Sequence, residues 1–273
     1  MKKGICYGCI PAEGGAAQRL AAVRAAGFDG VELTFAAVGE GPLTMGLGGA
    51  DIDALRHLVA SHGLQATSVM GGGLLRDAPL VAADAAVRER GVSNLRLGLR
   101  IAARLGADTI LVHPGQLRPD ARYDDAFGWL VDALRALRPD LEATGVGLAV
   151  ENVWNKFLLS PLEMRELIDR VDHPLVGAYF DVGNVVAFGY PQQWLRILGP
   201  RVRRVHLKDF RGRPGQLGGF CQLMDGDVDW PAVVAALVAI GYDGYLTSEV
   251  GGVGLEETAR RIDRIMALAA APT

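Results

Sequence analysis

Short apolar, β-prone runs alternate along the chain with longer segments of helical periodicity. The runs that predict strands lie at residues 4–9, 30–35, 65–70, 108–113, 146–152, 176–182, 202–208 and 244–250. Helical patterns cover residues 16–27, 51–63, 93–106, 126–145, 160–171, 191–198, 229–241 and 257–270. Eight strand–helix units, with no linker or shift in composition between them, predict an α/β protein with one (β/α)8 barrel domain over residues 1–273.

Local signals mark several ends of the predicted helices. Glycines that favour a left-handed helix end stand at Gly27, Gly63, Gly106, Gly145 and Gly241. Ser160 and Asp229 each stand just before a proline of the first helical turn, as N-cap residues do. A doubly wound sheet is the alternative, but its G-x-G-x-x-G phosphate turn does not follow the first strand. The GGG at 71–73 lacks the rest of that pattern and is interpreted as a flexible loop.

Composition limits the partners of the protein. Hydrophobic residues make up 50% of the chain and charged residues 22%, as in ordinary soluble domains with a large core. The formal net charge is -3 without a basic stripe, so we expect no nucleic-acid partner. The apolar stretch near the N-terminus is too short for a secretion signal or a membrane span, and we expect a cytoplasmic protein without a membrane partner.

Acidic and histidine side chains stand where four of the predicted strands end. Glu151, Asp181, His206 and Glu249 close the runs VGLAVEN, VGAYFDVGN, RVRRVHLKDF and GYLTSEV. C-terminal strand ends share one face of a barrel, so these side chains are expected to lie together. Three carboxylates and one imidazole suit Mn²⁺, Mg²⁺ or Co²⁺ more than an ion that prefers thiolates. One such residue alone is more often a helix cap or surface group, but the four together predict a divalent-metal site.

Groups suited to a small hydroxylated substrate follow the same strand ends. Asn152 can bind hydroxyl groups and Trp154 can stack on the face of a sugar. Lys208, Arg211 and Arg213 could bind a phosphate, although solvated loop charges explain them equally well. The predicted ligand is therefore a sugar or a sugar phosphate.

Other chemistry-bearing residues have a structural interpretation beside the functional one. Cys6 and Cys9 form a C-x-x-C, but they lie inside the first apolar run and no second pair completes a zinc site, since Cys221 is the remaining cysteine. His113 could orient the substrate, support a metal ligand or cap its loop. Glu32 could reach the pocket, although a structural salt bridge is the favoured role.

The motifs resemble those of the xylose isomerase-like TIM-barrel superfamily, in its sugar phosphate isomerase/epimerase branch. The resemblance spans nearly the whole chain, through GFDGVEL, LGADTILVHPG, ENVWNKFLLSP, YFDVGNV, RRVHLKDF and GDVDWPAVVAALVAIGYDGYLTSEV. It implies a TIM barrel whose Mn²⁺-type ion is held by Glu151, Asp181, His206 and Glu249. The resemblance also implies that Glu151 and Glu249 act as the acid–base pair, and such barrels commonly form dimers or tetramers.

The implied reaction is proton abstraction from a ketose or sugar phosphate to a metal-bound enediolate, giving an epimer or an isomer. Loss of water from the same species would give a dehydratase or lyase, and the sequence leaves these outcomes open. Many relatives have a histidine three residues after the aspartate, where this chain has Asn184, a predicted substrate contact. Endonuclease IV-like DNA repair, which needs more histidines, and non-catalytic sugar binding are the lesser alternatives. The glycine-rich segment 36–49 could be a substrate lid or a surface loop.

Overall fold

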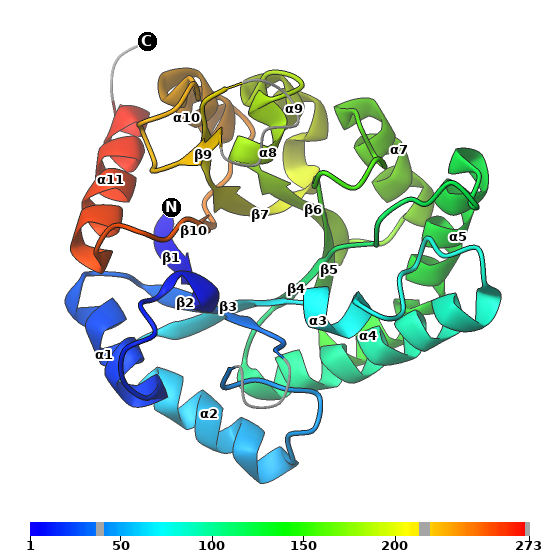
Figure 1. The fold of residues 1–273 in the computed structure, drawn as a ribbon, viewed down its shortest axis with the longest axis horizontal. Coiled ribbons are helices and arrows are strands. Elements are labelled where there is room, and N and C mark those ends of the chain that lie inside the picture. The colour runs from blue at the N-terminus through cyan, green and yellow to red at the C-terminus, as the bar shows by residue number, and fades with distance from the viewer. Residues whose placement is uncertain (37–40, 213–218, 271–273) are drawn as a thin grey trace.

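The structure, a computed structural model, describes residues 1–36, 41–212 and 219–270, and in these ranges eight parallel strands close into a barrel (Figure 1). Around the ring their order is β1-β10-β7-β6-β5-β4-β3-β2. The strands are β1 (Lys2–Cys6), β2 (Gly30–Thr34), β3 (Gln65–Met70), β4 (Thr109–Val112), β5 (Gly147–Glu151), β6 (Val176–Asp181), β7 (Val202–Leu207) and β10 (Tyr245–Ser248). The predicted barrel and its strands are confirmed, and the first strand differs most, because it ends at Cys6.

Helices surround the barrel on its outside (Figure 1). The longer ones are α1 (Ala16–Ala25), α2 (Gly49–Ser61), α4 (Ala85–Leu105), α5 (Tyr123–Ala136), α6 (Arg138–Thr144), α7 (Pro161–Val171), α9 (Pro191–Leu198), α10 (Trp230–Ala239) and α11 (Leu255–Ala267). Short elements are α3 (Gly72–Leu75), α8 (Val182–Val186), the 3-10 turns η1 (Tyr7–Cys9), η2 (Gly199–Arg201) and η4 (Leu268–Ala270), and the hairpin of β8 (Asp209–Phe210) and β9 (Phe220–Cys221). None of the described helices is both long and apolar enough to span a membrane.

Two predicted helices have different limits in the structure. The pattern over 126–145 is divided into α5 and α6, because Pro139 has no N–H for a continuous helix and instead occupies the first turn of a new one. Helix α4 begins at Ala85, well before residue 93. Asp84 caps it there, since its side chain accepts a hydrogen bond from the backbone N–H of Ala86 at 2.8 Å.

The predicted helix ends are otherwise confirmed. The five glycines expected at helix ends have positive φ angles: Gly27 (88°), Gly63 (69°), Gly106 (82°), Gly145 (69°) and Gly241 (71°). Ser160 Oγ accepts from the N–H of Glu163 at 3.3 Å, and Asp229 accepts from the N–H of Ala232 at 3.0 Å. These caps fix where each helix starts and ends, and therefore how long each loop at the barrel mouth is.

The interpretation of residues 71–73 as a flexible loop is wrong. Gly72 and Gly73 are the first two residues of α3. Close packing explains why glycines stand at positions 71 and 73. A Cβ atom on Gly71 would lie 2.5 Å from the carbonyl oxygen of Leu111, and one on Gly73 would lie 2.2 Å from that of Phe35. The glycines let the end of β3 pass close to its neighbours, so α3 is held against the barrel.

The hydrophobic core has two parts. The larger cluster fills the space between the strands and the helices, with fully buried residues such as Phe28, Leu99 and Ile262. A separate small cluster of Leu111, Ala149 and Tyr179 comes from the adjacent strands β4, β5 and β6. Because this cluster does not contact the larger one between strands and helices, its three side chains point into the barrel, where side chains stack in layers in this fold.

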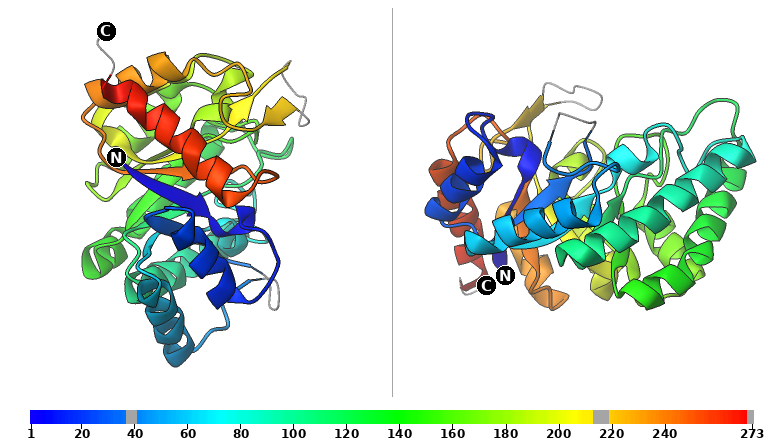
Figure 2. Two further views of the ribbon diagram at one scale, coloured as in Figure 1. Left: turned by 90° about the vertical axis from the view of Figure 1, so that its left-hand side faces the viewer. Right: turned by 90° about the horizontal axis from the view of Figure 1, so that it is seen from below.

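Parts of two predicted features lie outside the described residues. Of the segment 36–49, residues 37–40 are not described, while Leu43 is fully buried and forms an isolated β-bridge with Phe35. Arg213 is also outside the described residues. The segments that follow β3 and β7, α3 and the β8–β9 hairpin, lie on the same side of the barrel (Figure 2, right).

Candidate metal and active site

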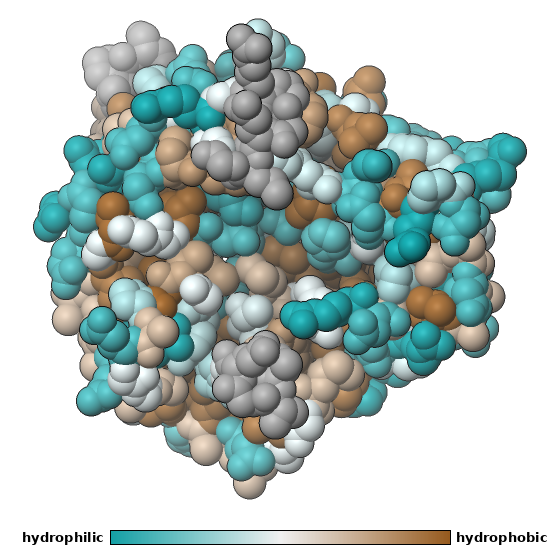
Figure 3. Space-filling model, in the orientation of Figure 1, coloured by the Kyte–Doolittle hydropathy of each residue, from teal (hydrophilic) through white to brown (hydrophobic). Residues whose placement is uncertain are grey.

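Inward-facing positions of β5 and β6 bring two carboxylates to the barrel mouth. Ala149 and Tyr179 belong to the inner cluster, and alternate residues of a strand share one face. Glu151 and Asp181 stand two positions further along the same strands and therefore also face inward. Seen from the side of Figure 1, a hollow near the centre of the molecule is bordered by both hydrophilic and hydrophobic residues (Figure 3).

The structure brings the four predicted metal ligands together. One ligand atom from each of Glu151, Asp181, His206 and Glu249 lies within 4.8 Å of the others. His206 Nδ1 is 3.2 Å from Glu151 Oε1, 2.9 Å from Glu249 Oε2 and 4.0 Å from Asp181 Oδ2. The first three side chains are buried, and Glu249 is partly exposed at 22%. The cluster is therefore a set of converging donors with one side open to solvent.

Glu32 orients the histidine of this cluster. Its carboxylate is fully buried, and Oε2 lies 2.7 Å from His206 Nε2. The other oxygen, Oε1, accepts hydrogen bonds from Tyr179 Oη at 2.7 Å and from Ser68 Oγ at 2.9 Å. The carboxylate holds a proton on Nε2 and so turns Nδ1 toward the other carboxylates. A salt-bridge role for Glu32 was expected from the sequence, but its partner and its effect on a ligand were not.

The buried charges shift the pKa values of the two glutamates in opposite directions. Burial raises the pKa of the Glu151 carboxyl to about 7. Burial would also raise the pKa of Glu249, but the nearby His206 and Lys208 outweigh it and lower that pKa to about 2. Burial alone would lower the pKa of His206, yet Tyr179, Glu32 and Glu249 hold it well above its usual value. Protons therefore occupy this cluster near neutral pH when no cation does.

Lys208 balances part of this negative charge. Its Nζ lies 3.1 Å from Asp181 Oδ2 and 2.8 Å from Glu249 Oε2, and these carboxylates keep the pKa of the ammonium raised against the effect of burial. Burial raises the pKa of Asp181, whose Oδ2 accepts no well-directed hydrogen bond from any described residue. A buried carboxylate oxygen without such a donor, beside three other oxygen and nitrogen ligands, fits a divalent cation.

Two predicted substrate contacts support the Asp181 backbone. Asn152 Nδ2 donates to the carbonyl of Asp181 at 2.8 Å, and Asn152 Oδ1 accepts from its N–H at 2.8 Å. The side chain of Asn184 donates to the carbonyl of Asn152 at 3.0 Å, and its N–H donates to Asp181 Oδ1 at 2.7 Å. Both asparagines are buried, so they fix the position of a ligand carboxylate, and substrate contact by either residue stays a prediction.

Trp154 stands in an aromatic group at the mouth. Its ring centroid lies 5.7 Å from that of Phe188, 5.5 Å from Phe210 and 5.1 Å from Phe220, and its Nε1 donates to the carbonyl of Asn184 at 2.9 Å. The half-buried indole is thus held rigidly in place. Its stacking on a sugar stays a prediction.

The other predicted substrate contacts lie around this centre. Arg211 is exposed and directly follows β8, where its N–H donates to the carbonyl of Gly219 at 2.8 Å. His113 directly follows β4, and its Nδ1 accepts from the N–H of Gly115 at 3.3 Å. Burial lowers the pKa of His113, so this imidazole is neutral near pH 7. His113 lines a separate pocket with Gly115.

The C-x-x-C pair is not contained in the first strand as predicted. Cys6 is buried at the end of β1, and Cys9 is partly buried in η1. The chain leaves the strand at Cys6 because the 3-10 turn follows at once. A hydrogen bond with Cys9 and burial raise the pKa of the Cys6 thiol, and Cys6 Sγ lies 3.7 Å from Thr34 Oγ1.

Asp209 has a structural role that the sequence did not reveal. Its fully buried carboxylate accepts from the N–H groups of Phe210 at 2.9 Å, Met224 at 2.9 Å and Val228 at 3.2 Å, and from Trp230 Nε1 at 2.9 Å. Asp209 thereby ties the hairpin to the start of α10.

Comparisons with known proteins agree with this barrel. The family model described as xylose isomerase-like TIM barrel matches residues 20–268. The chain belongs to this family. The resemblance stated from the sequence motifs is therefore confirmed.

Individual members of the xylose isomerase-like family are similar over most of the chain. A 2-epi-5-epi-valiolone 7-phosphate 2-epimerase of Actinoplanes sp. is 33% identical over 198 residues, which are 72% of this chain and 68% of that protein. A putative L-ribulose-5-phosphate 3-epimerase of Escherichia coli is 27% identical over 249 residues, 85% of this chain and 82% of that protein. The crystal structure of a D-tagatose 3-epimerase-like protein has the same fold, with a TM-score of 0.83 at 18% identity over 99% of this chain and 98% of that one.

Proposed function

We propose that the protein is a divalent-metal-dependent isomerase or epimerase of a ketose or sugar phosphate. The observation that carries this proposal is the convergence of Glu151, Asp181, His206 and Glu249 within 4.8 Å at the barrel mouth. Membership of the isomerase/epimerase class of enzymes follows from the relatives, which act on phosphorylated cyclitols and ketoses according to their names. The small-sugar substrate and the metal dependence are the parts that we add.

The four side chains would hold the ion through three carboxylates and the Nδ1 of His206. An oxygen-rich set with one imidazole favours Mn²⁺, and Mg²⁺, Co²⁺ and Zn²⁺ are alternatives. When bound, such an ion polarises a carbonyl group and makes the neighbouring C–H more acidic. Glu32 supports this arrangement because it keeps the Nδ1 of His206 directed at the site.

Glu151 and Glu249 are the proposed acid–base pair. One glutamate removes the proton from the carbon beside the carbonyl, which leaves an enediolate. Return of a proton to the opposite face gives the epimer, and return to the neighbouring carbon gives the isomer. In the metal-free cluster the two pKa values are well separated, about 7 for Glu151 and about 2 for Glu249, and this difference between the two carboxyl groups supports distinct acid and base roles.

The other interpretations of the sequence lead to different products. A dehydratase or lyase would share the proton abstraction and then lose water, so its product would contain one C=O or C=C group more. An endonuclease IV-like enzyme would cut abasic DNA, and a sugar-binding module would bind metal and ligand without turnover. A cytoplasmic location and a dimer or tetramer remain predictions.

Deuterium incorporation tests the proposal directly. Manganese-loaded protein in D₂O is incubated with ketoses and their phosphates, and the products are analysed by NMR and mass spectrometry. We expect deuterium at a carbon beside the carbonyl, and we expect Glu151→Gln and Glu249→Gln each to abolish incorporation. Glu166→Gln is the matched control, because Glu166 is exposed on α7 and pairs with Arg170 at 2.7 Å. Full activity of Glu249→Gln would disprove the two-glutamate mechanism.

A further inference from the structure

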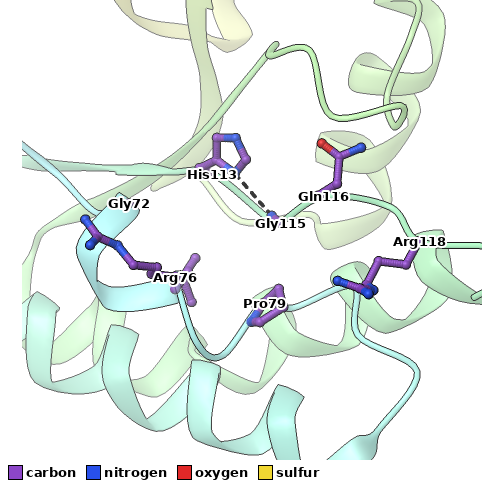
Figure 4. Close-up of a pocket in the computed structure, with 8 residues that line it drawn as sticks. Gly72, Arg76, Pro79, His113, Gly115, Gln116 and Arg118 are labelled. Atoms are coloured by element: carbon purple, nitrogen blue, oxygen red, sulfur yellow. Dashed lines mark hydrogen bonds between the residues drawn. The ribbon is translucent and has the colours of Figure 1, made fainter.

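We call Glu151, Asp181, His206 and Glu249 the metal-ligand cluster. A cavity opens between the segments that follow β3 and β4. It has a volume of about 430 Å³, and its lining includes Arg76, Pro79, His113, Gly115, Gln116 and Arg118 (Figure 4). We call it the arginine pocket. Its volume falls in the range of small-molecule sites, about 300 to 1,000 Å³.

Strand pairing places the arginine pocket one strand away from Glu151. Val112 of β4 pairs with Val150 of β5, and the next residues on the two strands are His113 and Glu151. Neighbouring strands are about 5 Å apart. A molecule of a few carbon atoms that reaches the metal-ligand cluster can therefore extend a substituent into the arginine pocket.

The charge of the arginine pocket is opposite to that of the metal-ligand cluster. Its described lining includes two arginines, a histidine and a glutamine, and no acidic residue. Neither Arg76 nor Arg118 takes part in an ion pair with any residue in the described ranges, and both are exposed. Figure 4 shows Arg118 reaching in toward Pro79, while Arg76 stands on the opposite side with its guanidinium group turned outward.

His113 adds a neutral donor to the same lining. Because its Nδ1 accepts the N–H of Gly115, the ring proton is on Nε2. Gln116 supplies further amide N–H groups beside it (Figure 4). A lining of donors without a carboxylate suits an anion that accepts several hydrogen bonds, and arginine matches the geometry of phosphate.

Two other described cations, Lys208 and Arg19, are already engaged. Lys208 is paired with Asp181 and Glu249. Arg19 donates to the carbonyl groups of Tyr7 at 3.0 Å and Ile10 at 2.9 Å. Binding a phosphate through Lys208 would break its ion pairs with Asp181 and Glu249. Arg76 and Arg118 can bind a phosphate without breaking any ion pair between described residues.

We propose that the arginine pocket binds the phosphate group of a phosphorylated ketose whose carbonyl end lies at the metal-ligand cluster. This inference rests on the proposed function for the carbonyl end, while the phosphate site can be tested without turnover. It relocates the phosphate site from the Lys208–Arg211 region, which the sequence suggested, to the loops after β3 and β4.

The first test is calorimetric titration of the magnesium-loaded protein with inorganic phosphate. We expect Arg118→Gln to weaken phosphate binding by about tenfold, the usual effect of losing a charge-assisted hydrogen bond, and Arg76→Gln, whose guanidinium group is turned outward, to weaken it less. Arg196→Gln is the matched control, because Arg196 is exposed on α9 and away from the arginine pocket. Phosphate binding that is unchanged in the Arg76→Gln/Arg118→Gln double variant would overturn the assignment of the phosphate site to the arginine pocket. Loss of phosphate binding in Arg211→Gln instead would also overturn it.

The second test compares each ketose with its terminal phosphate in the deuterium assay. The Arg76→Gln/Arg118→Gln double variant should raise KM for the phosphorylated substrate by about tenfold or more relative to KM for the unphosphorylated ketose, and Arg196→Gln should change neither KM. Exchange of free ketoses with no phosphate binding by the wild-type protein would keep the proposed function and refute the phosphate site. Phosphate binding that depends on Arg118, without exchange of any substrate, would keep the phosphate site and refute the proposed function.

Discussion

Replacing Glu32 by glutamine tests how the metal-ligand cluster is built. Glu32 Oε1 accepts two hydrogen bonds, from Tyr179 and Ser68, and Oε2 accepts one from His206 Nε2. In the Glu32→Gln variant, the single side-chain oxygen of the glutamine can keep the first two donors. Its NH₂ group then faces Nε2 and favours the tautomer with the proton on Nδ1, which is the nitrogen directed at the site.

The expected effect is a loss of metal affinity with a modest change in fold stability. Removing the outer partner of a metal-binding histidine lowers affinity by about 10- to 100-fold, or about 1.4 to 2.7 kcal/mol. The dissociation constant for Mn²⁺ is measured by competition with a chelator, and the melting temperature of the metal-free protein is measured in parallel. The affinity should fall even though glutamine has nearly the same shape as glutamate.

Glu142→Gln is the matched control for this substitution. Glu142 also faces a histidine, with its Oε1 3.8 Å from His173 Nε2, but its side chain is 72% exposed and lies on α6. It should leave the dissociation constant unchanged. A Glu32→Gln protein that folds normally and binds Mn²⁺ within about threefold of wild type would refute the proposed orienting role.

Three further results are expected. Asp209→Ala leaves four donors without an acceptor and should lower the free energy of unfolding by about 3 kcal/mol or more in urea denaturation. Asn184→Ala removes the donor to the Asn152 carbonyl, so the free energy of unfolding, measured by thermal denaturation, should fall by about 1 to 3 kcal/mol. Protons compete with the cation for Glu151, so Mn²⁺ affinity should fall as the pH drops through about 7, and a calorimetric affinity independent of pH would contradict this.

The features that the sequence predicts well are those that repeat. Strand and helix rhythms gave the barrel, because burial imposes a period of two on strands and of 3.6 on helices. The four ligands were visible because each stands at the end of a strand, and parallel strands of a barrel end on one face. The five helix-ending glycines were visible because a left-handed residue is needed at each.

What the sequence could not predict depends on contacts between distant segments. Glu32 meets His206 across 174 positions of the sequence, and nothing near either residue indicates the pairing. The glycines at 71–73 resemble a loop until the carbonyl groups of Phe35 and Leu111 are seen to exclude a Cβ. Arg76 and Arg118 are ordinary surface arginines in the sequence and become a pair only because both line one pocket.

Closure of the barrel has a consequence for how the protein would acquire the proposed metal ion. Lys2 of β1 pairs with Tyr245 of β10, and the ligands come from β5 to the end of β10, while the partner of His206 comes from β2. The four candidate ligands and Glu32 therefore come together only after segments from both halves of the chain have met, which are slow, non-local contacts. A cation that bound there would stabilise the closed barrel and not the open chain. Such a cation would then bind after folding and make its last step harder to reverse.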